Sequence, residues 1–178
     1  MRVHDPVVVR AARPEEYDEI GDLTVQVYIG GGYVSAHSPY VGELAATARR
    51  AVAGRILVAT YADRIVGSLT VAPPGTPYAE IALPGELEFR MLAVAKSARG
   101  LGAGTALVRT VIDMARMEGF AAVALTTMPA MADARRIYHR FGFLPVPSRY
   151  WHTESGEQLH VLRLPLDKEG GDVTGSAP

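Results

Sequence analysis

The feature of this sequence that most constrains its fold is a pair of apolar segments joined by a glycine-rich turn and an amphipathic stretch. Residues 86–94 are predicted to form one strand and residues 121–127 a second, buried strand. The apolar residues between them recur at helical spacing and are Leu107, Val108, Val111, Ile112 and Ala115. A helical crossover joins strands that run in the same direction, so these two strands are expected to be parallel. The sequence therefore predicts a mixed α/β sheet with a parallel central strand pair and helices on both faces.

The turn before this helix has the features of an anion-binding site. Its residues are Val94-Ala-Lys-Ser-Ala-Arg99-Gly-Leu-Gly-Ala-Gly104. The N–H groups of a first helical turn lack intrahelical partners and lie at the positive end of the helix dipole. Gly100, Gly102 and Gly104 leave room for a phosphate group, and Arg99 adds a permanent positive charge. The alternative is a tight turn without a ligand, which the glycines alone do not exclude.

Two common phosphate-binding loops fit this turn poorly. A Walker loop has Lys-Ser or Lys-Thr after its last glycine, and neither follows Gly104. A dinucleotide-binding turn would need a third glycine where Thr105 stands, and residues 121–127 supply no acidic side chain for a ribose. The sequence thus favours a different phosphate-bearing cofactor.

Composition excludes several other classes of function. The chain has 178 residues, of which 48% are hydrophobic, and we expect one domain over residues 1–166 and a disordered polar tail over residues 167–178. Its 18 basic and 19 acidic residues give no field that would attract nucleic acid or an anionic membrane. There is no cysteine, and the histidines lack metal-ligand spacing, so neither a thiol nucleophile nor a metal site is expected. No signal peptide or apolar run of membrane-spanning length is recognisable, which predicts a cytoplasmic protein.

The remaining segments predict short elements around this centre. Strands are expected at residues 7–10, 143–146 and 158–164, and a hairpin at residues 55–61 and 65–71. Helices are expected from residue 13 onward, over residues 43–52 and over residues 132–141. Residues 28–40 and 73–85 have the composition of loops.

Two motifs together identify a family. Arg99-Gly-Leu-Gly102-Ala-Gly104 begins five residues after Val94, and Ala134-Arg-Arg-Ile-Tyr138-His-Arg-Phe-Gly142-Phe143 follows one helix and one strand later. In this order and register, they resemble the acetyl-CoA loop and a second block of the GCN5-related N-acetyltransferase (GNAT) superfamily. The resemblance covers roughly residues 7–166 and has two departures. Lys96 replaces a usual proline, and Met131 replaces a common asparagine.

The resemblance implies acetyl-CoA as cofactor and a mostly antiparallel sheet whose parallel central strands splay apart after a bulge. The acyl-pantetheine arm would enter the gap between these strands. Arg135, near the start of the helix predicted over residues 132–141, is a further candidate for cofactor binding. The residues that the resemblance implies for cofactor binding are Leu92, Ala93, Val94, Arg99, Gly100, Leu101, Gly102, Ala103, Gly104 and Thr105.

Transfer of an acetyl group to an amine requires a base, because only the neutral amine attacks a thioester. Glu88 is the first candidate, since it matches an acidic position common on this strand in the family, and Glu86 and Glu80 are reserves. Strand alternation predicts that Glu88 shares a face of the sheet with Glu86, Arg90, Leu92 and Val94. The alternative is a solvated carboxylate paired with Arg90 or another arginine.

Tyr138 is the candidate acid for the departing thiolate, and its alternative role is aromatic core packing. We expect substrate contacts from Tyr33, Tyr78 and Glu86. Substrate choice is expected from residues 28–40, 73–85 and 149–156, whose composition favours a neutral or aromatic acceptor over a strongly anionic one. The predicted activity is direct transfer, in a ternary complex, to a primary amine of a small molecule or peptide. The alternative is a non-catalytic acyl-CoA-binding regulatory module, and either would be a monomer or a homodimer.

Overall fold

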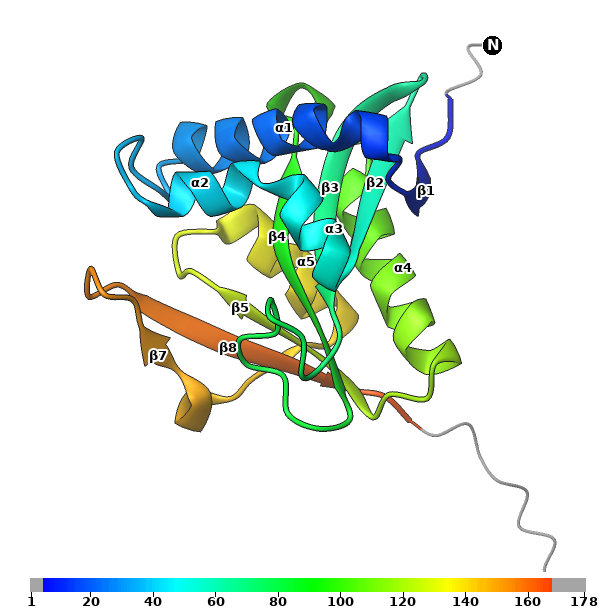
Figure 1. Ribbon diagram of the computed structural model, residues 1–178. Helices are drawn as coiled ribbons and strands as arrows, with labels where there is room; N and C mark the ends of the chain where they lie inside the picture. Colours follow the sequence, from blue (N-terminus) through cyan, green and yellow to red (C-terminus); the bar gives the residue numbers. More distant parts are fainter. Residues whose placement is uncertain (1–4, 168–178) are drawn as a thin grey trace, which may run out of the picture.

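The computed structural model describes residues 5–167, in which a single mixed sheet runs through the molecule (Figure 1). The strand order is β1-β2-β3-β4-β5-β8-β6, with β7 paired to β8. Among the described strands, β4 and β5 form the one parallel pair, as predicted. The strands are β1 (Val8–Ala11), β2 (Arg55–Tyr61), β3 (Arg64–Ala72), β4 (Glu86–Val94), β5 (Ala122–Thr127), β6 (Leu144–Pro145), β7 (Trp151–His152) and β8 (Gln158–Pro165). All but the first residue of the predicted tail at 167–178 lies outside the described residues.

Helices cover both faces of this sheet (Figure 1). Helices α4 and α5 pack over the larger core on one face, and helices α1, α2 and α3 pack over two smaller apolar clusters on the other. None of the helices described here is long and apolar enough to cross a membrane. The α-helices are α1 (Tyr17–Gly30), α2 (Tyr40–Ala45), α3 (Thr47–Ala53), α4 (Ala103–Met117) and α5 (Ala132–Phe141), and the short 3-10 helices are η1 (Pro14–Glu16), η2 (Lys96–Ala98) and η3 (Pro147–Arg149).

The single helix predicted over residues 43–52 is wrong, because the chain breaks it into α2 and α3 at Ala46. The side chain of Arg50 on α3 turns back and donates hydrogen bonds to the carbonyl groups of Glu43 and Leu44 at the end of α2. Arg50 is 1% exposed, and this capping satisfies both its guanidinium and the last carbonyl groups of α2. A tertiary contact of this kind leaves no periodic signal in the sequence.

A bulge in β4 also corrects the predicted alternation. Ser68 and Thr70 lie two residues apart on β3, but their partners Ala93 and Arg90 lie three apart on β4. Met91 is the extra residue of this bulge, and its φ is 56°, a value that is uncommon for residues other than glycine. The strand therefore changes face at this point. Leu92 and Val94, which were expected beside Glu88, face α4 and α5 with the larger core, and the contacts of Glu86, Glu88 and Arg90 lie on the opposite face.

The parallel pair comes apart beyond the bulge. Strands β4 and β5 are paired at three positions, of which Glu88 opposite Ala124 is the last. Strand β4 continues to Val94 and β5 to Thr127 without further pairing to each other. This divergence opens a gap in the middle of the sheet, between the helices on its two faces.

Candidate functional site

The first cavity lies where the glycine-rich turn enters α4 and has a volume of about 1170 Å³. Gly102 is the N-cap of α4 with a φ of 80°, a backbone conformation that glycine adopts without strain. Within the described chain, no backbone acceptor is recorded for the N–H groups of residues 102–105. Residues 102–105 all line the cavity, so these N–H groups are available to an anion there.

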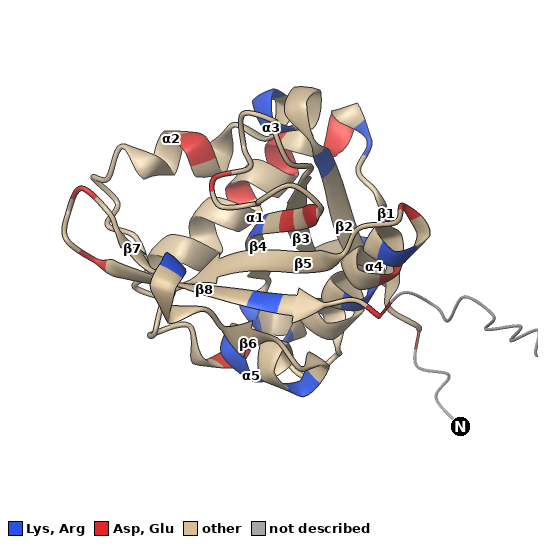
Figure 2. Cartoon of the chain, turned by 90° about the horizontal axis from the view of Figure 1, so that it is seen from below, with Lys and Arg blue, Asp and Glu red and all other residues tan. Residues whose placement is uncertain are grey.

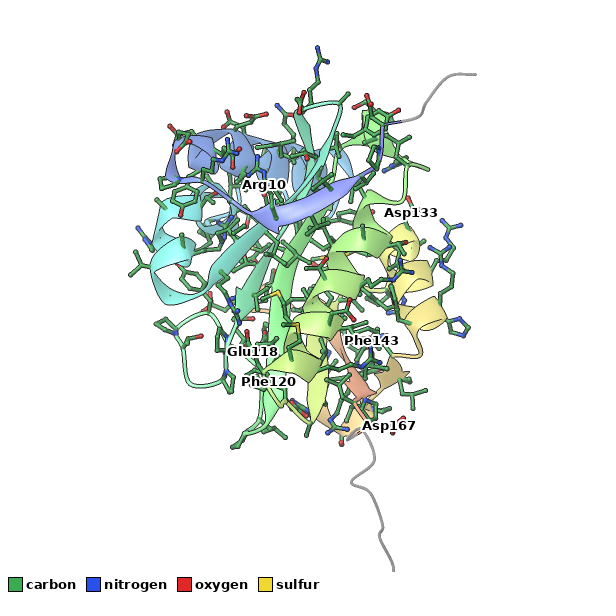
Figure 3. The ribbon with its side chains drawn as sticks, turned by 90° about the vertical axis from the view of Figure 1, so that its right-hand side faces the viewer. Arg10, Glu118, Phe120, Asp133, Phe143 and Asp167 are labelled. Atoms are coloured by element: carbon green, nitrogen blue, oxygen red, sulfur yellow. The ribbon has the colours of Figure 1, made fainter. Side chains whose placement is uncertain are left out.

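Basic side chains surround this end of α4. The first cavity is lined by Arg99, Arg135, Arg136 and Arg140, and by a single carboxylate, Asp133. Asp133 lies 3.9 Å from Arg99 and also pairs with Arg136, which leaves the cavity with a surplus of positive charge. Figure 3 shows Asp133 at the end of α5 that lies beside the beginning of α4, far from Glu118 at the other end of α4. Free N–H groups and arginines are the donors that suit the phosphate groups of a nucleotide cofactor.

The second cavity, with a volume of about 980 Å³, lies beside the first. It is lined by α2, by the connection between β3 and β4, by the ends of β4 and β5, and by the connection between β7 and β8. The two cavities share five lining residues, which come from α1 and its following loop, the gap side of β4, and the start of α5. The shared residues are Tyr28, Tyr33, Leu92, Met131 and Ala134. A ligand in the first cavity and a ligand in the second would therefore meet at the gap between β4 and β5.

Two phenols from opposite faces of the sheet line the second cavity. Tyr138 on α5 is 4% exposed and packs edge to face against Phe89 and Phe143, at centroid distances of 5.9 and 5.8 Å. Tyr28 on α1 is 9% exposed and packs against Tyr33. Neither hydroxyl group makes a hydrogen bond within the part of the chain that the structure describes. Burial raises the pKa of both phenols, so both stay protonated and able to donate.

Glu88 is completely buried, and it lines neither cavity. Its Oε2 atom accepts hydrogen bonds from the N–H groups of Ile81 and Ala82, both at 3.0 Å. Its Oε1 atom has no partner among the described residues. Burial raises the pKa of Glu88 above the usual carboxyl value, despite the opposing effect of these hydrogen bonds and of Arg90. Such a carboxyl group holds a proton more readily than a solvated one.

The other carboxylates near β4 are held by arginines. Glu86 is 4% exposed and contacts Arg149 at 2.9 Å and Arg163 at 2.7 Å. It lines neither cavity, and neither does Tyr78, so the structure does not bring these two expected substrate contacts to the site. Glu80 does line the second cavity, where it pairs with Arg90.

Most of the expected cofactor contacts surround the first cavity. Ala93 and Leu101 are not among its lining residues, because Ala93 faces the α1 side and Leu101 is exposed. Sequence reasoning did not assign Tyr28, which the predicted loop contained, and it did not include Arg136 among the cofactor contacts. The expected residues that do line the first cavity are Leu92, Val94, Arg99, Gly100, Gly102, Ala103, Gly104, Thr105 and Arg135, and Tyr33 lines both cavities.

Curated relatives match about half of this sequence. The chain is 38% identical over 86 residues to the camello protein of Xenopus tropicalis, a match that covers 48% of this chain and 36% of the relative. It is 30% identical over 96 residues to N-acetyltransferase 8B of Homo sapiens, covering 54% of this chain and 41% of the relative. The matches therefore span less than half the length of these two relatives.

Solved structures match nearly the whole chain. A GCN5-related N-acetyltransferase from Kribbella flavida has a TM-score of 0.66 and 27% identity, with 90% of this chain and 98% of that chain covered. The Salmonella typhimurium protein yncA, solved with its cofactor acetyl-CoA, has a TM-score of 0.66 and 18% identity, with 95% and 99% covered. The model of the acetyltransferase (GNAT) family matches residues 22–143, which is more than half of the chain. This chain therefore belongs to the acetyltransferase (GNAT) family.

Proposed function

We propose that this protein transfers the acetyl group of acetyl-CoA directly to a primary amine of a small molecule or peptide. The observation that carries the proposal is the meeting of two cavities at the gap between β4 and β5, one lined by arginines and free N–H groups and the other by buried phenols. Acetyl-CoA, the cofactor of the family, supplies a thioester that a neutral amine attacks. The sequence has no cysteine to carry the acetyl group, which supports direct transfer.

The first cavity fits the cofactor. In this proposal, the N–H groups of residues 102–105 and the guanidinium groups of Arg99, Arg135, Arg136 and Arg140 hold its phosphate groups. The unpaired edge of β4 beyond Glu88 offers backbone groups to an amide-bearing arm in the gap, in the way that a peptide adds to a sheet edge. A Cβ atom at position 104 would lie only 2.8 Å from the Cδ1 atom of Ile137. Glycine at this position therefore avoids a clash with Ile137.

Glu88 is the proposed base, acting through an intermediary because it does not line the second cavity. Thr126 does line that cavity, and it lies two residues beyond Ala124, the partner of Glu88 on β5. Thr126 Oγ1 and Glu88 Oε1 are both buried without a hydrogen-bond partner in the described chain. Residues two apart on a strand share a face. The amine proton would pass to Glu88 through the Thr126 hydroxyl group or a water molecule beside it.

Tyr138 is the proposed donor to the departing thiolate. Its phenol is buried, has no partner in the described chain, and lines the cavity at the gap. The raised pKa keeps the phenol protonated, so Tyr138 would donate a hydrogen bond to the thiolate and keep its own proton, because a thiolate is a weaker base than this phenolate. Tyr28 faces the same cavity from α1 and would supply a second hydrogen bond at this position.

Two measurements on the whole protein test this function. Acetyl-CoA should raise the melting temperature, and an Arg99→Ala variant should need a higher acetyl-CoA concentration for the same shift. A panel of primary amines should then be screened for release of free thiol from acetyl-CoA, with an acetylated product identified by mass spectrometry. Binding without thiol release from any amine would contradict the transfer reaction, and the absence of binding would contradict the cofactor site as well.

A further inference from the structure

The two cavities differ in the sign of their charge. The first cavity has a surplus of arginine, whereas the second is lined by four carboxylates, Glu43, Glu80, Glu154 and Glu157, and by one guanidinium, Arg90. In Figure 2, acidic residues appear on α2, on the connection between β3 and β4, and on the connection between β7 and β8, while α5 is mostly basic. A cleft lined mainly by one sign of charge concentrates ligands of the opposite sign.

Two of these carboxylates are free to meet a ligand. Glu43 and Glu80 each pair with an arginine, at 3.3 and 2.9 Å. Glu154 and Glu157 are exposed and form no ion pair with any residue in the range 5–167. Their connection is fixed internally, because the N–H group of Thr153 donates to the Glu157 carbonyl group at 2.9 Å and the N–H group of Glu157 donates to Thr153 Oγ1 at 3.1 Å. The rim of the second cavity therefore presents two uncompensated negative charges.

The one guanidinium group in the second cavity is already occupied. Arg90 contacts Glu80 at 2.9 Å and donates hydrogen bonds to the Tyr40 hydroxyl at 3.2 Å and the Tyr78 carbonyl at 3.1 Å. A carboxylate on the acceptor would have to displace Glu80 to reach it. Among the described lining residues, this cavity thus offers an anionic acceptor no free arginine or lysine partner.

The same cavity also contains two buried phenols without hydrogen-bond partners among the described residues. Tyr28 and Tyr138 are both more than nine-tenths buried and line it, and neither hydroxyl has a hydrogen-bond partner in the described chain. Buried polar groups normally have partners, so two unpartnered phenols in one cavity indicate where a ligand's polar atoms belong. The cavity thus has a hydrogen-bonding inner end and a negatively charged rim.

We propose that the acceptor is a small amine that carries a second cationic group, with one amine at the two phenols and the other cation between Glu154 and Glu157. This inference rests on the proposed acetyl transfer and names its substrate class. The loop composition indicated a neutral or aromatic acceptor, and the placement of the four carboxylates changes that expectation to a cationic one. The cavity volume, about 980 Å³, is of the size that holds a small molecule.

Three amines of similar length test the proposal: diaminobutane, butylamine and γ-aminobutyrate. Diaminobutane should have the highest kcat/KM for thiol release, about fivefold to tenfold above butylamine, and γ-aminobutyrate the lowest. High salt should reduce the difference between the diamine and the monoamine, because exposed charges are screened. Calorimetric binding of diaminobutane to the protein with CoA present gives a readout that does not depend on turnover.

The decisive variant combines Glu154→Gln with Glu157→Gln. It should weaken diaminobutane binding and kcat/KM by about fivefold and should affect butylamine, which carries a single charge, by less, so that the preference for the diamine falls. The matched control combines Glu19→Gln with Asp22→Asn, two exposed acids on α1 that line neither cavity, and it should alter neither amine. Equal kcat/KM values for the diamine and the monoamine, or an unchanged preference in the decisive variant, would overturn the inference while the transfer reaction stands. Absence of thiol release with all three amines and with the wider amine panel would instead overturn the proposed function.

Discussion

At the scale of single residues, the partners of each buried carboxyl group near β4 decide what that group can do. Glu86 and Glu88 lie two positions apart on one strand, yet the pKa of Glu86 is lowered and that of Glu88 is raised. Glu86 has two arginine partners, whereas Glu88 has backbone N–H groups on one oxygen only. Both groups are hidden from solvent, so the difference comes from their partners. Glu88 is left as the carboxyl group that can accept a proton.

Replacing Glu88 with glutamine should lower kcat/KM by about a hundredfold near neutral pH, because a positioned base contributes that much. The loss should shrink as pH rises toward the pKa of the acceptor amine, about 10 for a lysine-like group, where the neutral amine forms without help. A pH profile of kcat/KM measures this.

The affinity for acetyl-CoA is the control for the Glu88→Gln variant and should not change. Its folding stability is the second control. Because folding raises the pKa of Glu88, the folded protein loses stability as pH rises toward that pKa and the buried carboxyl group ionises. The Glu88→Gln variant should therefore be at least as stable as the unmodified protein near neutral pH. A variant with the pH profile of the unmodified protein would remove Glu88 from the mechanism.

Sequence reasoning predicts which residues lie together where they are close in the chain. The donors of the glycine-rich turn are consecutive in the chain, so spacing alone brings Arg99 and the N–H groups of residues 102–105 together. The second cavity is different, because its carboxylates come from α2 and from two separate connections. No pattern along the chain predicts that Glu43 and Glu157 line the same cavity. Only the folded arrangement reveals the charge of that cavity.

At the scale of elements, the contact between α1 and α2 shapes the second cavity, because α2 carries two of its lining residues, Tyr40 and Glu43. Gly21 on α1 faces the end of α2, and a Cβ atom there would lie 2.5 Å from the carbonyl oxygen of Ala45. That oxygen belongs to the backbone and cannot move without its helix.

The Gly21→Ala variant should therefore be destabilised by about 1–3 kcal/mol, the usual range for overpacking. The variant should also raise KM for the amine more than KM for acetyl-CoA, because α2 lines the second cavity and does not line the first. Urea denaturation and steady-state kinetics measure the two effects. Gly30→Ala on the same helix is the matched control, since a Cβ atom there meets nothing within 4 Å. Equal stability of the two variants would show that α2 moves freely.

Elements with a strong local pattern were predicted correctly, and those shaped by tertiary contacts were not. The hairpin of β2 and β3 and the bounds of β4 follow from alternation and turn composition. The break at Ala46 depends on Arg50, which reaches back from α3, and the bulge at Met91 depends on pairing with β3. The short strand β7 was missed because two residues carry no period.

At the scale of the whole molecule, Glu86 ties distant parts of the chain together. It accepts hydrogen bonds from Arg149 at the end of η3, from Arg163 on β8, and from the N–H group of Leu83 in the connection before β4. Burial alone would raise the pKa of Glu86, but these hydrogen bonds outweigh burial and lower it. A carboxyl group whose pKa is lowered by folding stabilises the folded protein at pH values above its pKa in the unfolded chain. This stabilisation is lost as pH falls through its pKa in the folded protein.

Glu86→Gln should cost about 3–5 kcal/mol at neutral pH, because it leaves two arginines without their carboxylate. The difference in unfolding free energy between this variant and the unmodified protein should shrink below about pH 4.5, as Glu86 itself becomes protonated. Urea denaturation across that pH range measures it. The control is Glu118→Gln, which breaks a more exposed ion pair with Arg55 and should cost about 1 kcal/mol or less. A constant difference at all pH values would mean that Glu86 acts through packing alone.

The short ladder between β4 and β5 should make the stability of this protein depend on its ligand. Three paired positions join the two halves of the sheet, and beyond them the backbone edges of the gap do not pair with each other. A ligand that binds those edges binds the folded chain and not the unfolded one, so it adds about 2.7 kcal/mol of stability at a hundred times its dissociation constant. Cells rich in acetyl-CoA would therefore shelter the enzyme from proteolysis, and cells depleted of it would degrade the enzyme sooner.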